Sequence, residues 1–247
     1  MRHRMIDVNG KWALITGASR GIGHQIALFM AKQGCNLVLH SRNLENTKEL
    51  EKNLKKFGIE IYRVQAELSN QKEIFSMLNE IDSKNIPIDI VFNNAGVQIA
   101  YRKDYLKTPV EDFDMSFRIN FISITIICYH FLPKMIERGF GRIINTTSGI
   151  KNEPEQAGYS ASKAALDKFT QDLGSKLNGT DVMINLVDPG WCRTDLGGPN
   201  APNPPESSIP GMVVGAFLDD KKSGRTFRAQ DYAGMDLKNA ILKAEQK

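Results

Sequence analysis

The stretch TGASRGIG at residues 16–23 decides the fold predicted for this chain of 247 residues. A short apolar run at residues 12–15 comes directly before it, and an amphipathic stretch at residues 22–33 follows it. The run is typical of a buried strand and the stretch is typical of a helix, so the glycines lie in the turn between the two. Glycine permits the tight backbone of such a turn and lets another group approach the chain closely.

The turn also has the chemistry of a phosphate site. The free N–H groups and the dipole of a helix N-terminus stabilise negative charge, and a pyrophosphate can bind there when glycines leave room for it. The spacing G-x-x-x-G-x-G differs from the commoner G-x-G-x-x-G, and a plain glycine-rich turn explains it equally well. Its position between the first strand and the first helix favours the phosphate site.

Predicted strands and helices alternate along the rest of the chain. Apolar runs predict strands at residues 36–39, 59–64, 88–92, 142–145 and 182–187, and amphipathic stretches predict helices at residues 44–57, 71–83, 111–137 and 159–177. This alternation implies right-handed crossovers and a buried parallel sheet. We therefore expect one α/β domain over residues 1–247, a doubly wound parallel sheet of about seven strands with helices on both faces. Five prolines predict a loop at residues 197–210, and residues 229–247 form a polar tail with a short helix.

Composition excludes several other classes of protein. A hydrophobic fraction of 41% is too high for a disordered chain, and three scattered cysteines fit neither a disulfide scaffold nor a metal site. A net charge of +4 is too small to indicate a nucleic-acid partner. Four polar residues interrupt the most apolar stretch, residues 119–133, so we expect no membrane span. Residues 1–12 do not resemble a secretory signal, and we expect a cytoplasmic protein.

Two further motifs follow predicted strands. The sequence NNAG at residues 93–96 comes at the end of the fourth strand, where ligands bind in open parallel sheets, although a turn alone also explains it. Tyr159 and Lys163 lie four residues apart, on one face of a predicted helix. The ammonium group of Lys163 can favour the phenolate of Tyr159, which then exchanges a proton near neutral pH. An exposed pair is the alternative, but Ser148 at the end of the preceding strand brings a hydroxyl to the same place.

Together these motifs resemble the short-chain dehydrogenase/reductase family over about residues 9–227. The resemblance rests on the turn at residues 16–23, on residues 93–96, on Asn120, Ser148, Tyr159 and Lys163, and on Pro189-Gly190, all in the family order. Residues 189–198 also resemble the carbonyl reductase-like branch. The resemblance implies a single Rossmann domain, a nicotinamide cofactor and a small carbonyl or alcohol substrate.

The resemblance implies a role for each catalytic residue. Tyr159 is the acid/base, Lys163 lowers its pKa and binds the nicotinamide ribose, and Ser148 polarises the substrate carbonyl. Asn120 holds a water in a proton relay, although it also fits an ordinary buried amide. Thr147 is an alternative to Ser148, because both are hydroxyls at the same strand end.

The implied cofactor-binding residues lie in the glycine-rich turn, at strand ends and after the sixth strand. They are Gly17, Ser19, Arg20, Gly21, Ile22, Gly23, Ser41, Arg42, Glu67, Leu68, Asn94, Ala95, Gly96, Tyr159, Lys163, Pro189, Gly190 and Thr194. Glu67 departs from the aspartate that the family usually has, and the segment from Ser148 to Tyr159 is two residues shorter than its commonest spacing. Because this segment borders the substrate, the substrate of better-known relatives cannot be transferred.

Cofactor choice depends on the end of the second strand. Ser41 stands where relatives that prefer NAD carry a carboxylate, and Arg42 follows it. A guanidinium suits phosphate oxygens, and Arg20 adds a second cation, so we expect NADP(H). The alternative for Arg42 is a solvated residue that opens the second helix.

The predicted function is an NADPH-dependent oxidoreductase that reduces a ketone or an aldehyde. A 3-oxoacyl thioester reductase of fatty-acid synthesis is one alternative, since Arg102, Lys103 and Lys107 could meet an acidic carrier, although a solvated basic loop also explains them. A non-catalytic NADP-binding regulator on the same scaffold is another.

Apolar side chains suggest two further surfaces. Trp191, residues 199–210 and Met212 predict an adaptable lid over the substrate, part of a proline-rich substrate loop at residues 191–210. The helix at residues 111–137 is apolar on several sides, which a sheet alone cannot cover. In the family this helix and the next form the subunit contact, so we expect a homodimer or homotetramer; covering loops in a monomer are the alternative.

Overall fold

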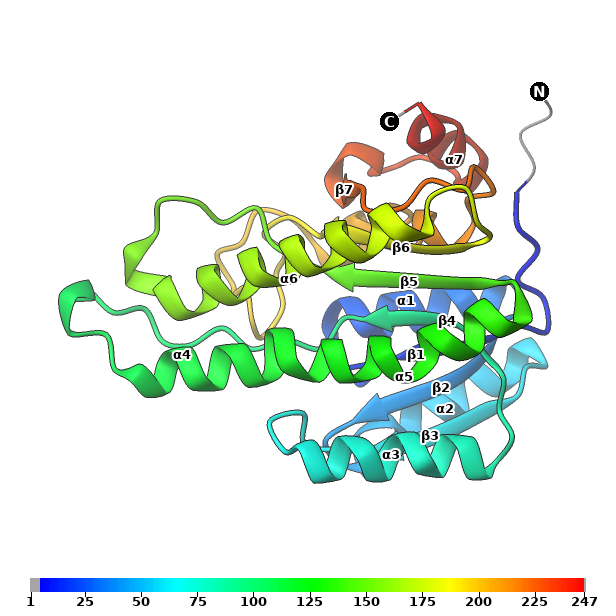
Figure 1. Ribbon diagram of the computed structural model, residues 1–247, viewed down its shortest axis with the longest axis horizontal. Helices are drawn as coiled ribbons and strands as arrows, with labels where there is room; N and C mark the ends of the chain where they lie inside the picture. The colour runs from blue at the N-terminus through cyan, green and yellow to red at the C-terminus, as the bar shows by residue number, and fades with distance from the viewer. Residues whose placement is uncertain (1–4, 247) are drawn as a thin grey trace.

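The computed structural model describes residues 5–246 and shows one parallel sheet of seven strands in the order β3-β2-β1-β4-β5-β6-β7 (Figure 1). The strands are β1 (Trp12–Ile15), β2 (Asn36–Ser41), β3 (Ile61–Gln65), β4 (Ile88–Asn93), β5 (Gly141–Thr146), β6 (Val182–Asp188) and β7 (Thr226–Arg228). The seven-stranded parallel sheet predicted from the alternation is confirmed. Residues 1–4, at the start of the segment expected not to be a secretory signal, and residue 247 lie outside the described residues.

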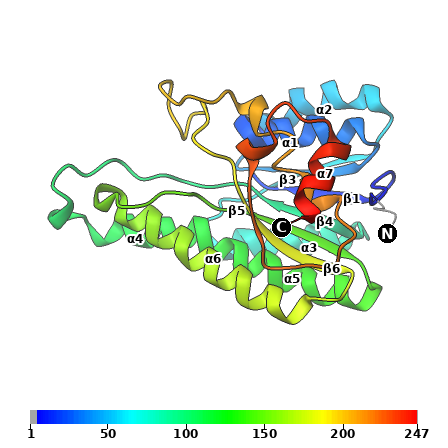
Figure 2. The same cartoon turned by 90° about the horizontal axis from the view of Figure 1, so that it is seen from above.

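Helices cover both faces of the sheet (Figure 2). They are α1 (Gly21–Lys32), α2 (Lys48–Leu54), α3 (Gln71–Ser83), α4 (Val110–Phe117), α5 (Ser123–Arg138), α6 (Ala157–Leu177) and α7 (Leu237–Glu245). The helices α1, α2 and α7 lie on one face, and α3, α4, α5 and α6 lie on the other (Figure 2). Each face has its own apolar cluster, because the central strands carry Val, Ile and Leu on both sides. The doubly wound arrangement is therefore confirmed.

Strand β1 occupies the point where the strand order reverses. It pairs in parallel with β2 on one side and with β4 on the other, so the crossovers from β1 and from β4 leave in opposite directions. The loops after these strands separate there and leave a crevice at the carboxyl edge of the sheet. The residues predicted to bind a cofactor follow these strands.

The predicted helix at residues 111–137 is not continuous. A π-helical segment, η4 (Arg118–Ile122), separates α4 from α5 and carries the buried Asn120. A π turn inserts one residue into a helix and often accompanies a functional site. The stretch predicted as a helix at residues 44–57 contains α2 between two short 3₁₀ segments.

The C-terminal segment joins the main core. The helix α7 confirms the short helix expected there, and Ala240, Ile241 and Ala244 bury its inner side against the cluster that contains α1. The segment at residues 197–210 is mostly irregular, as its prolines predict, apart from the 3₁₀ turn Pro205–Ser208.

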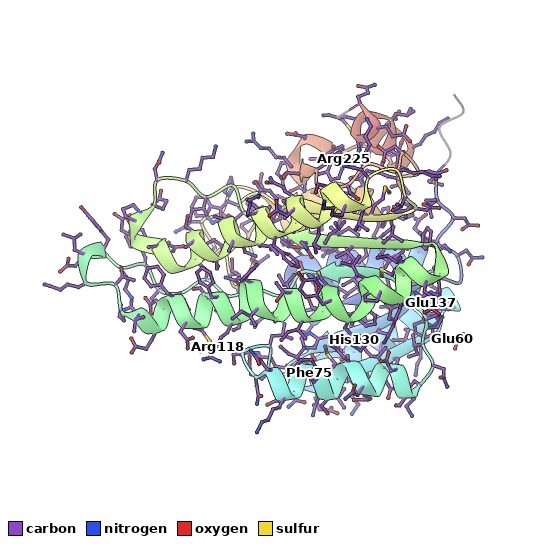
Figure 3. The ribbon with its side chains drawn as sticks, in the orientation of Figure 1. Glu60, Phe75, Arg118, His130, Glu137 and Arg225 are labelled. Carbon is purple, nitrogen blue, oxygen red and sulfur yellow. The ribbon has the colours of Figure 1, made fainter. Side chains whose placement is uncertain are left out.

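The helical stretch Val110–Arg138, which comprises α4, η4 and α5, is long and apolar enough to cross a membrane by length and composition alone. Its α5 part packs against α3, β4 and β5 as an interior helix of the domain. His130 lies on the side of α5 that faces α3 (Figure 3), where its Nε2 is 3.0 Å from Asp82 Oδ2. A core helix of an α/β domain passes the same composition test, so this stretch is no evidence for a membrane span.

Candidate functional site

The glycine-rich turn leaves β1 and opens α1 with no room for larger residues. Gly17 and Gly21 have φ values of 66° and 55°, in the left-handed region that favours glycine. A Cβ on Gly23 would lie 2.2 Å from Gly17 O and 2.6 Å from Asn94 Nδ2. The turn therefore places its backbone N–H groups and the N-terminus of α1 at the floor of the crevice.

Two buried side chains fasten this turn to its neighbours. Thr16 Oγ1 accepts hydrogen bonds from the N–H groups of Asn94 and Ala95, both at 3.0 Å, which ties the end of β1 to the end of β4. His40 Nδ1 accepts the N–H of Gly17 at 3.2 Å, and its Nε2 donates to Ala66 O at 3.0 Å. Burial lowers the pKa of His40 to about 4, so the ring is neutral and its Nδ1 stays an acceptor.

A cleft of about 780 Å³ runs from the end of β2 to the start of α6. Its volume falls within the usual range for a cofactor site. Most of the predicted cofactor-binding residues line it: Gly17, Ser19, Arg20, Gly21, Ile22, Ser41, Arg42, Glu67, Leu68, Asn94, Ala95, Gly96, Tyr159, Lys163, Pro189 and Thr194. Four predicted residues do not: Gly23, Asn120, Ser148 and Gly190 lie behind or beside its walls.

The outer end of the cleft holds the residues that would read a ribose phosphate. Ser41 is buried and donates its hydroxyl to Asn43 O at 2.6 Å, while Arg42 is exposed at the rim. Arg20 is not a free cation, because its guanidinium lies 2.6 Å from Asp195 Oδ2 across the cleft mouth. The Glu67 carboxylate accepts hydrogen bonds from the N–H and the hydroxyl of Ser69, at 3.0 and 3.1 Å.

The inner end of the cleft brings Ser148, Tyr159 and Lys163 together. Ser148 lies beside the Tyr159 hydroxyl, close enough to lower its pKa, and its Oγ accepts the N–H of Ile150 at 3.2 Å. The Lys163 ammonium lies 5.9 Å from the centre of the Tyr159 ring and donates to Thr146 O at 2.7 Å. Tyr159 is 8% exposed and Lys163 is 3% exposed. Ser148, from the loop after β5, thus lies beside two buried groups of α6, Tyr159 and Lys163.

The pKa of Tyr159 differs from the expectation. Burial raises it, the Asp188 charge raises it further, and the hydrogen bond with Ser148 lowers it. The lowering expected from Lys163 is therefore not seen in the free protein, because desolvation of the phenolate dominates. Burial also lowers the pKa of Lys163 to about 8.

The hydroxyl of Thr147 does not compete with that of Ser148. It donates to the Asp167 carboxylate on α6, one helical turn beyond Lys163. Burial raises the pKa of Asp167, and the Thr147 hydroxyl and Lys163 lower it. Of the two candidate hydroxyls, that of Ser148 lowers the pKa of Tyr159, whereas that of Thr147 is bonded to Asp167.

The side chain of Asn120 holds the loop after β4. Its Oδ1 accepts the Val97 N–H and its Nδ2 donates to Val97 O, both at 2.9 Å. Nδ2 also donates to Ser162 Oγ at 3.1 Å. Both donors of the amide are therefore used within the protein, and the side chain fixes the backbone beside Gly96.

The segment after β6 is held by its own hydrogen bonds. Trp191 is 59% exposed, and its Nε1 donates to Gly197 O at 2.7 Å. Arg193 donates to the carbonyls of Ala201 and Pro202. The prediction that Met212 belongs to the lid is wrong: Met212 is fully buried in the core beside α1 and α7.

Sequence reasoning missed several residues that line the cleft: His40, Asn46, Ser69, Val97, Met115, Ile119, Thr146, Asp195 and Leu196. Most are sequence neighbours of predicted residues, so a window of one or two positions around each motif would have found them. Met115 and Ile119 come from α4 and the π segment, and no motif marks them. Among residues 5–246 no group of three or more His, Cys, Asp or Glu could hold a metal ion.

Comparisons with known proteins agree with this geometry. A family model described as short chain dehydrogenase matches residues 11–204. The 3-oxoacyl-acyl-carrier-protein reductase of Rickettsia felis is 33% identical over 234 residues, which cover 93% of each chain, and that of Aquifex aeolicus is 32% identical over 194 residues, 77% of each. The crystal structure of a short-chain type dehydrogenase/reductase from Mycobacterium marinum matches 90% of this chain and 94% of its own, with a TM-score of 0.81 and 26% identity. The chain therefore belongs to the short-chain dehydrogenase/reductase family, and it is an oxidoreductase that binds a nicotinamide cofactor.

Proposed function

We propose that this enzyme is an NADPH-dependent reductase that converts a ketone or an aldehyde to an alcohol. The observation that carries the proposal is that Ser148 lies beside the Tyr159 hydroxyl and the buried Lys163, at the inner end of the cleft. One carbonyl oxygen can contact both hydroxyl groups there. Ser148 polarises the carbonyl, and Tyr159 donates the proton to its oxygen.

The protonation states suit reduction. The raised pKa of Tyr159 keeps its hydroxyl protonated at neutral pH, ready to donate. Lys163, with a pKa of about 8, is mainly protonated at pH 7. Its ammonium group stabilises the negative charge that develops on Tyr159 as the proton leaves.

The residues of the cleft fit a nicotinamide dinucleotide. The N–H groups of the glycine-rich turn and the N-terminus of α1 would hold the pyrophosphate, and the positive φ values of Gly17 and Gly21 permit the tight turn that presents these groups. Asn94, Ala95 and Gly96 would lie under the ribose nearest the nicotinamide, and Lys163 would bind its hydroxyls. When bound, the cofactor supplies the hydride.

Residues at the end of β2 support NADPH over NADH. No carboxylate stands at Ser41, and the exposed guanidinium of Arg42 lies at the rim of the cleft. Arg20 contributes a second cation once its ion pair with Asp195 opens. A carboxylate at this place would repel a 2′-phosphate, whereas these groups attract it.

Replacing Tyr159 with Phe tests the proposal. The change removes the proton donor and keeps the ring, so we expect kcat/KM for the reduction of a ketone to fall by about a hundredfold or more. NADPH binding, measured by fluorescence titration, should remain, and Tyr129→Phe on the exposed side of α5 is the matched control. Near-wild-type reduction by Tyr159→Phe would overturn the assignment.

A 3-oxoacyl thioester reductase is the second candidate, because relatives named so are 32–36% identical to this chain. The basic loop gives it little support. Arg102 forms a two-pronged ion pair with Asp112 at 2.7 and 2.9 Å, and Lys107 pairs with Asp104 at 2.8 Å. Activity on an acyl-carrier thioester far above that on simple ketones would make it the first candidate.

A non-catalytic NADP-binding regulator fits less well. A protein that only binds the cofactor has no need to keep Ser148 beside the buried Tyr159 and Lys163. NADPH binding without turnover over a broad panel of carbonyl compounds would favour the regulator.

The outer faces of α5 and α6 support a homodimer or homotetramer. Tyr129 and Phe121 each meet Phe169 edge to face, at 5.6 and 5.9 Å between ring centres, and Tyr129 is largely exposed. A second copy would cover these rings. Light scattering that gives a mass near 27.6 kDa at micromolar concentration would contradict this assembly. We also propose a cytoplasmic location, which the free and buried Cys35, Cys128 and Cys192 support.

A further inference from the structure

Asp188, the last residue of β6, lies beside the catalytic groups although no motif marks it. Its Oδ1 accepts the N–H of Gly190 at 2.9 Å. Its Oδ2 lies against the loop after β5, where a Cβ on Gly149 would be only 2.7 Å away. Gly149 directly follows Ser148, so the Asp188 carboxylate borders the space beside the Ser148 hydroxyl.

The charge of Asp188 interacts electrostatically with the catalytic groups. It raises the pKa values of Tyr159, Lys163 and the Asp167 carboxyl. In the described part of the chain no Lys, Arg or His comes within 4.0 Å of the Asp188 carboxylate. Oδ2 therefore has no salt-bridge partner among the described residues, and the next residue, Pro189, lines the cleft.

We propose that Asp188 determines specificity by accepting a hydrogen bond from a hydroxyl or an ammonium group next to the reacting carbonyl of the substrate. This inference rests on the proposed function, which places the carbonyl oxygen between Ser148 and Tyr159. A purely apolar neighbour would desolvate the carboxylate without replacing the lost hydrogen bonds. A carboxylate on the substrate would be repelled by Asp188.

The other end of the substrate is apolar. Val97, Met115, Ile119 and Leu196 line the same cleft from the loop after β4, from α4 and η4, and from the segment after β6. The substrate class is therefore a ketone with a polar donor on one side of the carbonyl and an apolar group on the other.

Four methyl ketones of similar size test the proposal: hydroxyacetone, aminoacetone, 2-butanone and pyruvate, each with NADPH. They carry beside the carbonyl a hydroxymethyl, an ammonium-methyl, an ethyl and a carboxylate group. For the wild type we expect kcat/KM for hydroxyacetone and aminoacetone to exceed that for 2-butanone by about tenfold, and pyruvate to be the poorest. In Asp188→Asn the ratio of aminoacetone to 2-butanone should fall by about tenfold.

Asp188→Asn is a conservative change, because the amide oxygen can still accept the Gly190 N–H. Asp167→Asn is the matched control: it removes another carboxylate that acts on Lys163, but one that is bonded to Thr147 and does not line the cleft. Its ratio of aminoacetone to 2-butanone should equal that of the wild type. If Asp188→Asn does not fold, the order of the four kcat/KM values of the wild type still tests the role of Asp188.

The outcomes separate this inference from the proposed function. Reduction of 2-butanone as fast as aminoacetone by the wild type, or an unchanged ratio in Asp188→Asn, overturns the role of Asp188 and leaves the reductase intact. Binding of NADPH with no reduction of any of the four ketones contradicts the reductase and, with it, the role of Asp188.

Discussion

The two ends of the cleft are built differently. At the nucleotide end, backbone turns and short side chains at adjacent strand ends hold one another: Thr16, His40 and Asn94 all bond the turn or its neighbours. At the substrate end, the Asp188 carboxylate lies against Gly149, and neither residue belongs to a sequence motif. Recognisable motifs therefore specify the first end, whereas the second depends on residues that the fold brings together without a motif.

Gly23→Ala tests how strictly the nucleotide end is built, and it should have the largest effect. The new Cβ would lie 2.2 Å from Gly17 O, a backbone atom that cannot move without opening the turn. Overpacking of this kind costs about 3 kcal/mol, which weakens NADPH binding by about a hundredfold. Fluorescence titration measures the dissociation constant.

The control is Gly215→Ala, which adds the same methyl group at a buried place with an ordinary 3.4 Å contact to Ile144. It should leave NADPH binding unchanged. If Gly23→Ala and the wild type bind NADPH equally well, the turn can adapt to an added methyl group. The nucleotide end would then not be the strictly built end of the cleft.

Arg42→Ala asks whether the nucleotide end also selects the cofactor. A hydrogen bond to a charged group is worth about 1.5–3 kcal/mol, so the preference for NADPH over NADH should fall by about ten- to a hundredfold. The measurement is kcat/KM with each cofactor on one ketone. Lys48→Ala, at the start of α2 where Lys48 pairs with Glu45, is the matched control. An unchanged ratio in Arg42→Ala would mean that this rim does not bind the 2′-phosphate.

The pH dependence of stability tests His40. Its folded pKa, about 4, lies below the ordinary value of 6.5, so the unfolded chain takes up a proton first as the pH falls. The stabilisation by the neutral ring is thus complete above about pH 6.5 and is lost progressively towards pH 4. Between pH 7 and pH 5 the loss is about 2 kcal/mol.

Urea unfolding at the two pH values measures this loss in the wild type and in His40→Asn. The lowered pKa values of His24 and His130 act in the same direction in both proteins, so only the difference belongs to His40. Equal losses in the two proteins would rule out a buried, neutral His40.

Much of the fold follows from local sequence. The six predicted strands agree with the structure to within about two residues, because buried parallel strands are continuous apolar runs bounded by polar or glycine residues. The seventh strand, β7, has only three residues and no such pattern. The π segment η4 was missed because an inserted residue hardly changes the apolar pattern of a helix that is apolar on most sides.

Site residues could be predicted where they belong to the same sequence motif. Tyr159 and Lys163 share a helix face, so their spacing alone brings them together. The neighbours of Asp188 could not be predicted, because its contact with Gly149 joins β6 to the loop after β5. Burial could not be predicted either: desolvation, and not Lys163, dominates the pKa of Tyr159.

Trp191→Phe tests the substrate end and should have the smallest effect. It removes the hydrogen bond from Nε1 to Gly197 O, which holds the segment after β6 together, while an aromatic ring stays in place. A hydrogen bond at an exposed position contributes about 1 kcal/mol or less, so we expect KM for a ketone to rise by about two- to fivefold. The dissociation constant of NADPH should not change, because Trp191 does not line the nucleotide end.

The control is Trp12→Phe, which changes the only other tryptophan. Trp12 lies at the start of β1, away from the cleft, so its replacement should alter neither KM nor the dissociation constant. If NADPH binding weakened as much as KM rose, the segment after β6 would support both ends, and the two could no longer be treated as separately built.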